Sequence, residues 1–270
     1  MHQRILLRLF ATALAFCTVA TGHASERYIT LASTTSTEAS GLFESIVPRF
    51  RETTGIDVRV VAVGTGQAFE IGRRGDADIV LVHDTEGERE FVANGYAEER
   101  RDVMYNDFVL VGPAGDPAGI ADSENALEAF TRIAEHQAPF ASRGDDSGTY
   151  RSERRLWADA GIDPTGGWYR ELGSGMGETL NTAAAMDAYA YTDRATWIAF
   201  DNRQDLEILF AGDEVLFNQY GSLLLSRERH PHLKHDLARE WHEWLLSAEG
   251  QEAIGAYALR GQQLFFPNAE

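Results

Sequence analysis

Residues 31–50 read LASTTSTEASGLFESIVPRF and show how this chain passes from strand to helix. A short apolar run leads into residues 33–37, all of which carry a hydroxyl group. Apolar residues then recur every three to four positions, which predicts a helix over residues 38–53, ended by Gly55. The strand, the hydroxyl run and the helix together indicate an α/β fold.

The same alternation continues along the chain. Strands are predicted at residues 28–32, 57–63, 79–82, 103–111, 139–142, 205–209 and 216–225. Helices are predicted at residues 38–53, 85–94, 123–135, 147–160, 232–246 and 248–259, with a short one ending near Arg73 and another that opens at the glycine-rich turn of residues 173–177. The first strands and helices follow a βαβαβαβ order, which favours a mostly parallel sheet with crossover helices. The GPAGDP segment, residues 112–117, is the clearest break and indicates a crossing between two lobes.

The first 24 residues have the features of a secretory signal peptide. They combine a basic start, an apolar stretch of twelve residues (9–20) and small residues before position 24. The apolar stretch is shorter than the roughly 20 residues that span a bilayer, although an N-terminal anchor stays the alternative. Cleavage after Ala24 would remove Cys17, the only cysteine, and would exclude disulfides and thiolate chemistry from the mature chain.

The charge of the mature chain excludes some partners. It would have 246 residues, with 22 basic and 42 acidic side chains and a net charge of −20. Such a surface disfavours nucleic acid and anionic membranes as partners.

Four segments rich in glycine, serine and threonine lie at predicted strand-to-helix junctions. They are STTST (33–37), VGTGQAF (63–69), SRGDDSGTY (142–150) and GSGMGETL (173–180). Unpaired N–H groups and the helix dipole make such junctions favourable for anions, and hydroxyl groups add donors. Ordinary helix capping explains any one segment alone, but capping needs one hydroxyl group and the first junction has five. We therefore expect these loops to bind a small anion.

The segments TTST, VAVGTGQA, GDADIVLVH, RRDVMYNDFVLVGP and SRGDDSGTY resemble the tungstate-binding periplasmic component of ABC transporters. The resemblance runs from about Thr30 to the C-terminus. It implies the type II periplasmic binding protein fold: two α/β lobes with mixed, mostly parallel sheets, helices on both faces and a cleft between the lobes. It also implies a tungstate or molybdate ligand.

The resemblance further implies which residues contact the oxyanion. Its motifs correspond here to Thr34, Thr35, Ser36, Arg143 and Thr149. Further candidates are Thr65, Gly66, Gln67 and Ser147, and the backbone of residues 175–177 is a candidate as well.

The chemistry of these residue types agrees with an oxyanion. Tungstate carries no proton near neutral pH, so a site made only of donors suits it, and Arg143 offers a charge-assisted pair of hydrogen bonds. Phosphate keeps a proton and needs an acceptor, which Asp145 or Asp146 would supply. We expect one of these carboxylates to orient Arg143 or to cap the following helix, and a phosphate- or other oxyanion-binding protein of the same fold stays the alternative.

Two segments are similar to motifs of other protein classes. GDDSGT is similar to a serine-protease nucleophile segment, with Ser147 as nucleophile and His83 and Asp84 as partners, but the second glycine is absent. His230, His232 and His235 could ligate a metal, but neither HExxH nor HxxEH occurs. We expect neither catalysis, nor a cofactor, nor a cation site.

The whole sequence predicts an exported, monomeric solute-binding protein in the periplasm of a Gram-negative type envelope. Residues 25–112 and 217–270 would form the first lobe and residues 113–216 the second. It would capture tungstate or molybdate between the lobes and deliver it to an ABC permease, without binding nucleic acid. A protein of this fold can also serve in sensing without transport, and the sequence has no motif that separates these two roles.

Overall fold

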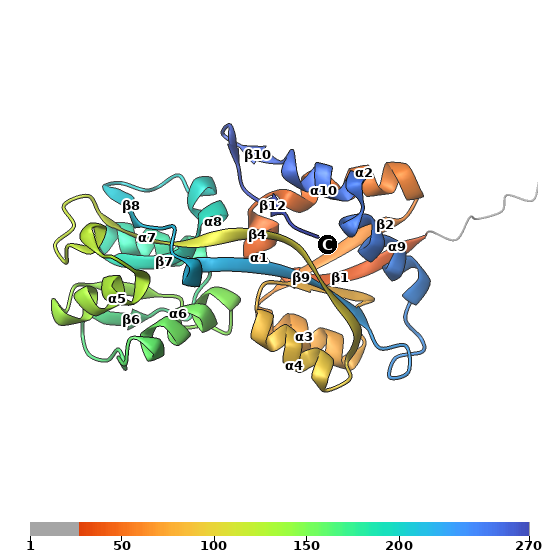
Figure 1. Ribbon diagram of the computed structural model, residues 1–270, viewed down its shortest axis with the longest axis horizontal. Coiled ribbons are helices and arrows are strands. Elements are labelled where there is room, and N and C mark those ends of the chain that lie inside the picture. Colours follow the sequence, from red (N-terminus) through yellow and green to blue (C-terminus); the bar gives the residue numbers. More distant parts are fainter. Residues whose placement is uncertain (1–26, 270) are drawn as a thin grey trace, which may run out of the picture.

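Two long strands form the middle of the molecule. The computed structural model describes residues 27–269, so the predicted signal peptide and Cys17 lie outside the described residues. In the described part β4 (Ala97–Pro113) pairs antiparallel with β9 (Phe217–Leu225). Figure 1 shows both strands crossing the centre of an elongated molecule, with helices gathered at either end.

The other elements are arranged around these two strands. The remaining strands are β1 (Tyr28–Thr34), β2 (Asp57–Val63), β3 (Ile79–Val82), β5 (Phe140–Ser142), β6 (Tyr169–Glu171), β7 (Tyr189–Asp193), β8 (Leu206–Phe210), β10 (Ala258–Leu259), β11 (Gln262–Gln263) and β12 (Phe266–Pro267). The helices are α1 (Thr35–Ala39), α2 (Leu42–Thr54), α3 (Thr65–Arg74), α4 (Thr85–Ala93), α5 (Ala126–Glu135), α6 (Gly148–Asp159), α7 (Met176–Met186), α8 (Arg194–Ala199), α9 (His235–Leu246) and α10 (Ala248–Gly255), with 3-10 turns at Ile120–Asp122 and Glu214–Leu216.

Most of the described strands form one mixed sheet, with the order β2-β1-β3-β9-β4-β7-β5-β6 and with β8 and β12 each paired to β4; β10 and β11 form a separate two-stranded sheet. β1 pairs parallel with β2 and β3, and β5 pairs parallel with β6 and β7, whereas β9 and β4 join these two groups through antiparallel pairs. β4 is thus not the next parallel strand beside β3, as the βαβαβαβ order suggested. β9, from near the C-terminus, lies between β3 and β4.

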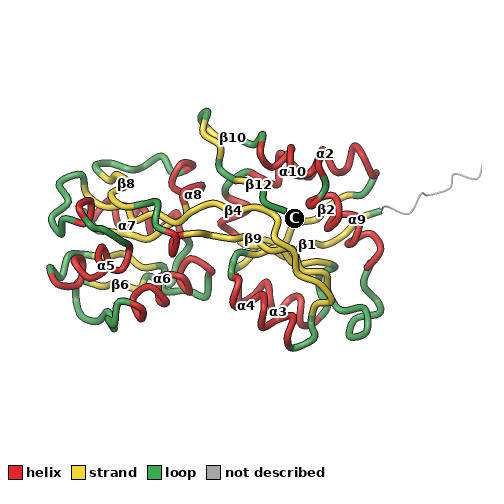
Figure 2. The backbone as a smooth tube through the Cα atoms, viewed as in Figure 1, coloured by secondary structure: helices red, strands yellow, loops and turns green. Residues whose placement is uncertain are grey.

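The sheet divides the molecule into two halves with separate cores. The first half contains β1–β3, α1–α4, α9 and α10, and the second half contains β5–β8 and α5–α7, as the tube in Figure 2 shows. One core of the first half includes Phe50 and Trp241, and the core under α5 and α6 in the second half includes Phe130 and Trp157. α8 contacts both halves, because Ile198 packs in a first-half core and Trp197 in a second-half core.

The chain crosses between the halves inside β4. Asp107 pairs with Phe217 of β9, and the next residue, Phe108, pairs with Asp193 of β7. The GPAGDP segment instead covers the end of β4 and the turn that follows it. At the crossing, the Arg194 guanidinium binds both carboxylate oxygens of Asp107, at 2.7 and 2.5 Å.

The predicted helix over residues 38–53 is two helices. α1 ends at Ala39 and α2 begins at Leu42, because Gly41 has a φ of 81°, in the left-handed region. This φ favours glycine, and a Cβ there would lie 2.5 Å from the Tyr257 hydroxyl oxygen, so a larger residue would also displace that side chain. Because of this break, the axis of the hydroxyl-rich α1 does not have to follow the axis of α2.

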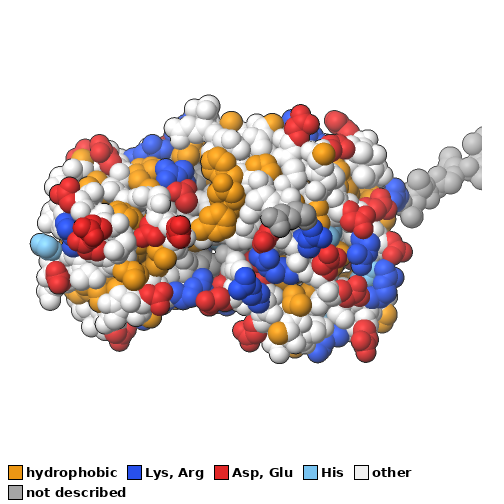
Figure 3. Space-filling model, in the orientation of Figure 1, with side chains coloured by type: hydrophobic (Ala, Val, Ile, Leu, Met, Phe, Trp, Pro, Cys, Tyr) orange, Lys and Arg blue, Asp and Glu red, His pale blue; other side chains and the backbone are white. Residues whose placement is uncertain are grey.

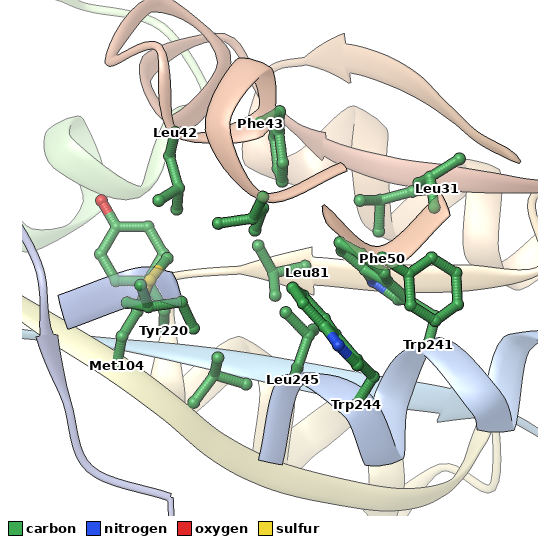
Figure 4. Packing of buried hydrophobic residues seen from close by; sticks show 14 of the residues in the cluster. Leu31, Leu42, Phe43, Phe50, Leu81, Met104, Tyr220, Trp241, Trp244 and Leu245 are labelled. Atoms are coloured by element: carbon green, nitrogen blue, oxygen red, sulfur yellow. The ribbon is translucent and has the colours of Figure 1, made fainter. Parts of the chain in front are cut away.

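Helices α2 and α9 cover the first half of the sheet with aromatic side chains. Phe50 meets the edge of the Trp241 ring at a centroid distance of 4.9 Å, and Trp241 stacks on Trp244 at 5.5 Å (Figure 4). Each fully buried side chain of this size contributes roughly 1.5–3 kcal/mol to folding. This packing fixes β1 and therefore the hydroxyl run at its carboxyl end.

The outer surface carries mixed charges. On the face drawn in Figure 3, acidic and basic side chains are interspersed and no large area has one sign. Among residues 27–269, no helix is both long and apolar enough to cross a membrane.

Candidate functional site

A cavity of about 350 Å³ lies where the two halves meet at α1, α7 and α8. Its lining consists of neutral side chains and one guanidinium: Thr35, Ser36, Ala39, Arg143, Gly175, Met176, Gly177, Thr196, Ala199 and Phe200. No carboxylate is among these lining residues. A cavity with donors and no negative charge favours an anion.

The hydroxyl run begins at the carboxyl end of β1. Thr34 Oγ1 accepts from Thr37 N at 3.3 Å and lies 3.1 Å from Ser36 Oγ and 2.7 Å from Thr37 Oγ1. Thr34 is therefore the N-cap of α1, while Thr35 and Ser36 line the cavity. The run divides into a capping residue and residues that face the cavity.

Arg143 is the only charged side chain of the cavity lining and is almost wholly buried. Its Nε and one terminal nitrogen donate to Asp145 Oδ2, at 3.1 and 2.6 Å, while Asp145 Oδ1 accepts from Ser147 N at 3.2 Å. The expectation that a neighbouring carboxylate orients Arg143 is confirmed for Asp145. Asp146 instead binds Arg151 at 2.7 Å.

A left-handed glycine gives the loop after β5 its shape. Gly144 has a φ of 61°, and a Cβ there would lie 2.6 Å from Glu171 Cβ and 3.0 Å from Glu171 Cα. Glycine alone permits this turn, which directs Arg143 into the cavity.

The second and third hydroxyl segments contact each other across the two halves. Thr65 Oγ1, at the start of α3, accepts from Gly148 N at 2.7 Å, and Gly66 N donates to Asp146 O at 3.2 Å. The helix start of each half is thus bonded to the other half. These contacts, and not the cavity, occupy the Thr65 hydroxyl and the Gly66 amide.

An ionic contact joins the halves beside these hydrogen bonds. Asp84 is 2% exposed and receives Arg151 at 2.9 Å and Arg155 at 3.3 Å, both from α6. Although Asp84 is the N-cap residue of α4, its side chain makes no capping hydrogen bond. The carboxylate therefore serves the contact between the halves.

Ser147 and Thr149 lie at the start of α6. The Ser147 hydroxyl caps the helix by accepting from Tyr150 N at 3.1 Å. The Thr149 hydroxyl is buried and has no hydrogen-bond partner in the described part of the chain. Such a group is costly to leave unpaired, so Thr149 stays a candidate donor.

The predicted site residues thus fall into two groups. The structure brings Thr35, Ser36 and Arg143 together with residues 175–177 around one cavity. The other candidates do not line it: Thr34, Thr65, Gly66, Gln67, Ser147 and Thr149. Gln67 is exposed, and its side chain makes no hydrogen bond to another residue within 27–269.

His83 contacts the cavity residue Ser36, although the sequence had indicated it only as a protease partner. Its Nε2 lies 3.1 Å from Ser36 Oγ and its Nδ1 lies 3.1 Å from Asn218 Oδ1. Burial lowers the pKa of His83, against the opposing effects of Asp193, the Asn218 hydrogen bond and Asp84, so the ring is neutral near pH 7. A polar residue at the end of the apolar strand IVLV was the available sequence signal.

Helix α8 was also missed by the sequence analysis. Thr196 lines the cavity, and both its backbone N and its hydroxyl donate to Asp193, at 2.8 and 2.6 Å. The preceding strand β7 is short and buried on all five residues, which leaves no alternating pattern to read.

The geometry gives no support to the hydrolase alternative. His83 contacts Ser36 and Asn218, whereas Asp84 contacts the arginines of α6. The Ser147 hydroxyl is used as a helix cap. Ser147, His83 and Asp84 therefore do not form the predicted series of hydrogen bonds.

Two of the histidines near α9 that could have bound a metal contact different backbone carbonyl oxygens instead. His232 Nε2 lies 3.1 Å from Gly75 O, and His235 Nε2 lies 2.7 Å from His230 O. Within residues 27–269, no group of three or more histidine, cysteine, aspartate or glutamate residues could hold a metal ion.

A buried carboxyl group supports the strand that precedes Arg143. Glu153 Oε2 accepts from Ser142 at 2.9 Å, while Oε1 accepts from Tyr169 at 2.8 Å and from Trp157 at 3.1 Å. Burial raises the pKa of Glu153 to about 7, although these three hydrogen bonds oppose the rise.

This pKa predicts a dependence of stability on pH. The folded protein keeps the Glu153 proton up to about pH 7, whereas the unfolded chain releases it near its ordinary pKa of 4.5. Stability from this group is therefore complete below pH 4.5 and is lost as the pH rises to about 7, by at most about 1.4 kcal/mol per pH unit. Urea unfolding of wild type and of Glu153→Gln should show a difference that changes over this range. A constant difference, or the same change in the exposed control Glu252→Gln, would contradict this origin.

Two α/β halves joined by β4 and β9, with helix starts and one buried guanidinium at a shared cavity, define the class of type II periplasmic binding proteins. A sequence model of the PBP superfamily domain matches residues 19–249. The chain belongs to the PBP superfamily.

Individual relatives place the chain within this superfamily. It is 44% identical over 245 residues to the tungstate-binding protein TupA of Peptoclostridium acidaminophilum, covering 89% of this chain and 86% of that protein. The solved structure of the tungstate ABC transporter from Geobacter sulfurreducens has 46% identity and a TM-score of 0.79, covering 86% and 99% of the two chains. The tungstate-binding protein TupA of Desulfovibrio alaskensis has 41% identity and the same TM-score, covering 90% and 100%. The names of these relatives describe binding and transport.

Proposed function

We propose that this protein binds tungstate or molybdate between its two halves and delivers it to an ABC permease. The observation that carries the proposal is the cavity between the halves, whose lining combines the Arg143 guanidinium with neutral residues. A tetrahedral dianion without a proton offers acceptors on every oxygen, and this lining supplies donors. The names of the relatives from Peptoclostridium and Desulfovibrio support tungstate in particular.

The donors come from both halves. Thr35 and Ser36 belong to the first half, whereas Arg143 and the start of α7 belong to the second. The N-cap residue of α7, Gly175, makes no side-chain cap, so backbone N–H groups of the first turn are available to the anion. We include the Thr149 hydroxyl because it is buried without a partner in the described chain.

The acidic composition is compatible with anion binding. Surface carboxylates beyond a Debye length of about 8 Å are screened, whereas the buried guanidinium and helix start act at close range. Asp145, the nearest carboxylate to Arg143, has both oxygens engaged in hydrogen bonds. We propose that the guanidinium and the helix start together outweigh the screened surface charge at the cavity.

We propose two lobes with the predicted limits. Residues 25–112 and 217–270 form the first lobe, and residues 113–216 form the second. The support for this division is the pair of strands β4 and β9, along which the chain passes between the separate cores, although the sheet changes partners between Asp107 and Phe108. We further propose export to the periplasm and action as a monomer without a cofactor. The N-terminal sequence supports export.

A competition series tests the proposed ligand. Calorimetry with tungstate, molybdate, sulfate and phosphate should give strong binding for the first two ions. Sulfate should bind weakly because its smaller tetrahedron leaves donors beyond good hydrogen-bond distance. Phosphate should bind weakly because its proton finds no carboxylate in the cavity lining. Tighter binding of phosphate than of tungstate would support the phosphate alternative and refute the proposal.

A further inference from the structure

A chain of buried polar side chains leads from the cavity to the two crossing strands. Ser36 Oγ lies 3.1 Å from His83 Nε2, and His83 Nδ1 lies 3.1 Å from Asn218 Oδ1. Asn218 Nδ2 donates to Asn106 Oδ1 at 2.6 Å. All four residues are at most 7% exposed. The direction of these hydrogen bonds decides what Ser36 presents to the cavity.

With the oxygen and nitrogen atoms of both asparagine amides placed as in the structure, the hydrogen bonds run in a direction that makes Ser36 a poor partner for an oxyanion. Asn218 Oδ1 can only accept, so the His83 ring donates from Nδ1. A neutral ring then has its lone pair on Nε2, which accepts the proton of the Ser36 hydroxyl. Ser36 would turn only lone pairs toward the cavity. This direction also leaves Asn106 Nδ2 buried without a partner in the described chain.

The opposite direction removes the first difficulty, and it places an amide oxygen instead of a donor at the unpaired position of Asn106. The oxygen and nitrogen of an amide have nearly the same shape, so both asparagine side chains can turn in place. Asn106 Nδ2 then donates to Asn218 Oδ1, Asn218 Nδ2 donates to His83 Nδ1, and His83 Nε2 donates to Ser36. The Tyr220 hydroxyl, 3.4 Å from Asn218 Nδ2, serves either direction because it can donate and accept.

We propose that His83 is a positioning residue that donates from Nε2 to Ser36 and thereby turns the Ser36 hydroxyl proton toward the bound oxyanion. The inference rests on the proposed function, because it requires an acceptor in the cavity. Between the two directions the His83 ring changes its tautomer: Nδ1 loses a proton, Nε2 gains one, and the charge of the ring stays the same. A second cavity of about 260 Å³, lined by His83 and Asn218, gives the ring access for this exchange.

The surroundings of His83 hold the ring for this role. Tyr220 packs against it at a centroid distance of 4.8 Å and Phe108 at 6.4 Å. The charged groups that face it are Asp84 beside α4, Asp193 before α8 and Arg143 in the cavity. The two carboxylates favour a protonated ring and Arg143 opposes it. A ring protonated on both nitrogens also donates from Nε2, so either form performs the proposed role.

Paired variants test the role by calorimetry with tungstate. His83→Leu should lower the affinity roughly tenfold to a hundredfold, as Ser36→Ala should. The alanine removes the donor to the charged ligand, and the leucine removes the group that keeps the Ser36 proton from turning to Thr34 Oγ1, 3.1 Å away. The double variant should bind no more weakly than either single variant. His83→Gln should stay within a few-fold of wild type, because its amide can place a donor near the position of Nε2. Glutamine no better than leucine would overturn the proposal.

Nitrogen NMR of wild type gives a test that needs no variant. Protein labelled with ¹⁵N-histidine should show a proton on His83 Nε2 when tungstate is bound. A proton on Nδ1 alone in the complex would overturn the inference. If wild type fails to bind tungstate, the proposed function fails. If it binds tungstate while Nε2 stays unprotonated, only the role of His83 fails.

Discussion

Replacing Arg143 with alanine is expected to lower tungstate affinity about a hundredfold to ten-thousandfold, the largest effect we predict. The variant would leave a buried dianion beside uncharged donors alone. Folding should change little, because the partner Asp145 is 24% exposed and gains water when the guanidinium is removed. Calorimetry measures the affinity, and thermal unfolding without ligand measures the stability.

The control for this prediction removes the same charge from the same half. Arg170 is exposed on β6, beside Ala141 of β5, so Arg170→Ala changes the net charge equally without touching the cavity. Its affinity should match wild type. If Arg143→Ala bound tungstate like this control, Arg143 would not belong to the binding site.

Replacing Gly148 with valine is expected to lower the affinity roughly tenfold to a hundredfold by obstructing the approach of the two halves. A Cβ at Gly148 would lie 3.1 Å from two atoms of the His83 ring and 3.2 Å from the His83 carbonyl oxygen. The ring has little room to move, since it is bonded to Ser36 and Asn218. Small-angle scattering should show less compaction on addition of tungstate than in wild type.

Gly167→Val is the matched control, because no atom lies within 4 Å of a Cβ at that glycine in the same half. The control should bind and compact like wild type. Normal compaction and affinity in Gly148→Val would show that the contact between Gly148 and His83 does not form on closure.

The limits of several elements could be read from the sequence. Residues 57–63 and 79–82 form strands with the predicted limits, since continuous β-branched runs depend on local preference and burial together. The predicted helix over residues 38–53 failed at Gly41, where contact with Tyr257 from a distant part of the chain matters. β7 and α8 were missed because short elements that are wholly or mostly buried have no alternating pattern.

The residues of the candidate site also divide into those that could be recognised in the sequence and those that could not. The hydroxyl run at Ser36, the helix starts and Arg143 were recognisable from residue types and their neighbours in sequence. His83 and Asn218 acquire their relation only through the pairing of β3 with β9, elements that are separated by more than a hundred residues.

The sequence by itself therefore determined which groups can donate to an anion, because donor chemistry belongs to the residue. The tertiary structure decided which of these donors face the cavity and which cap helices or join the halves. It did so because a hydroxyl group's direction and partner depend on strands and helices that meet only in the folded chain.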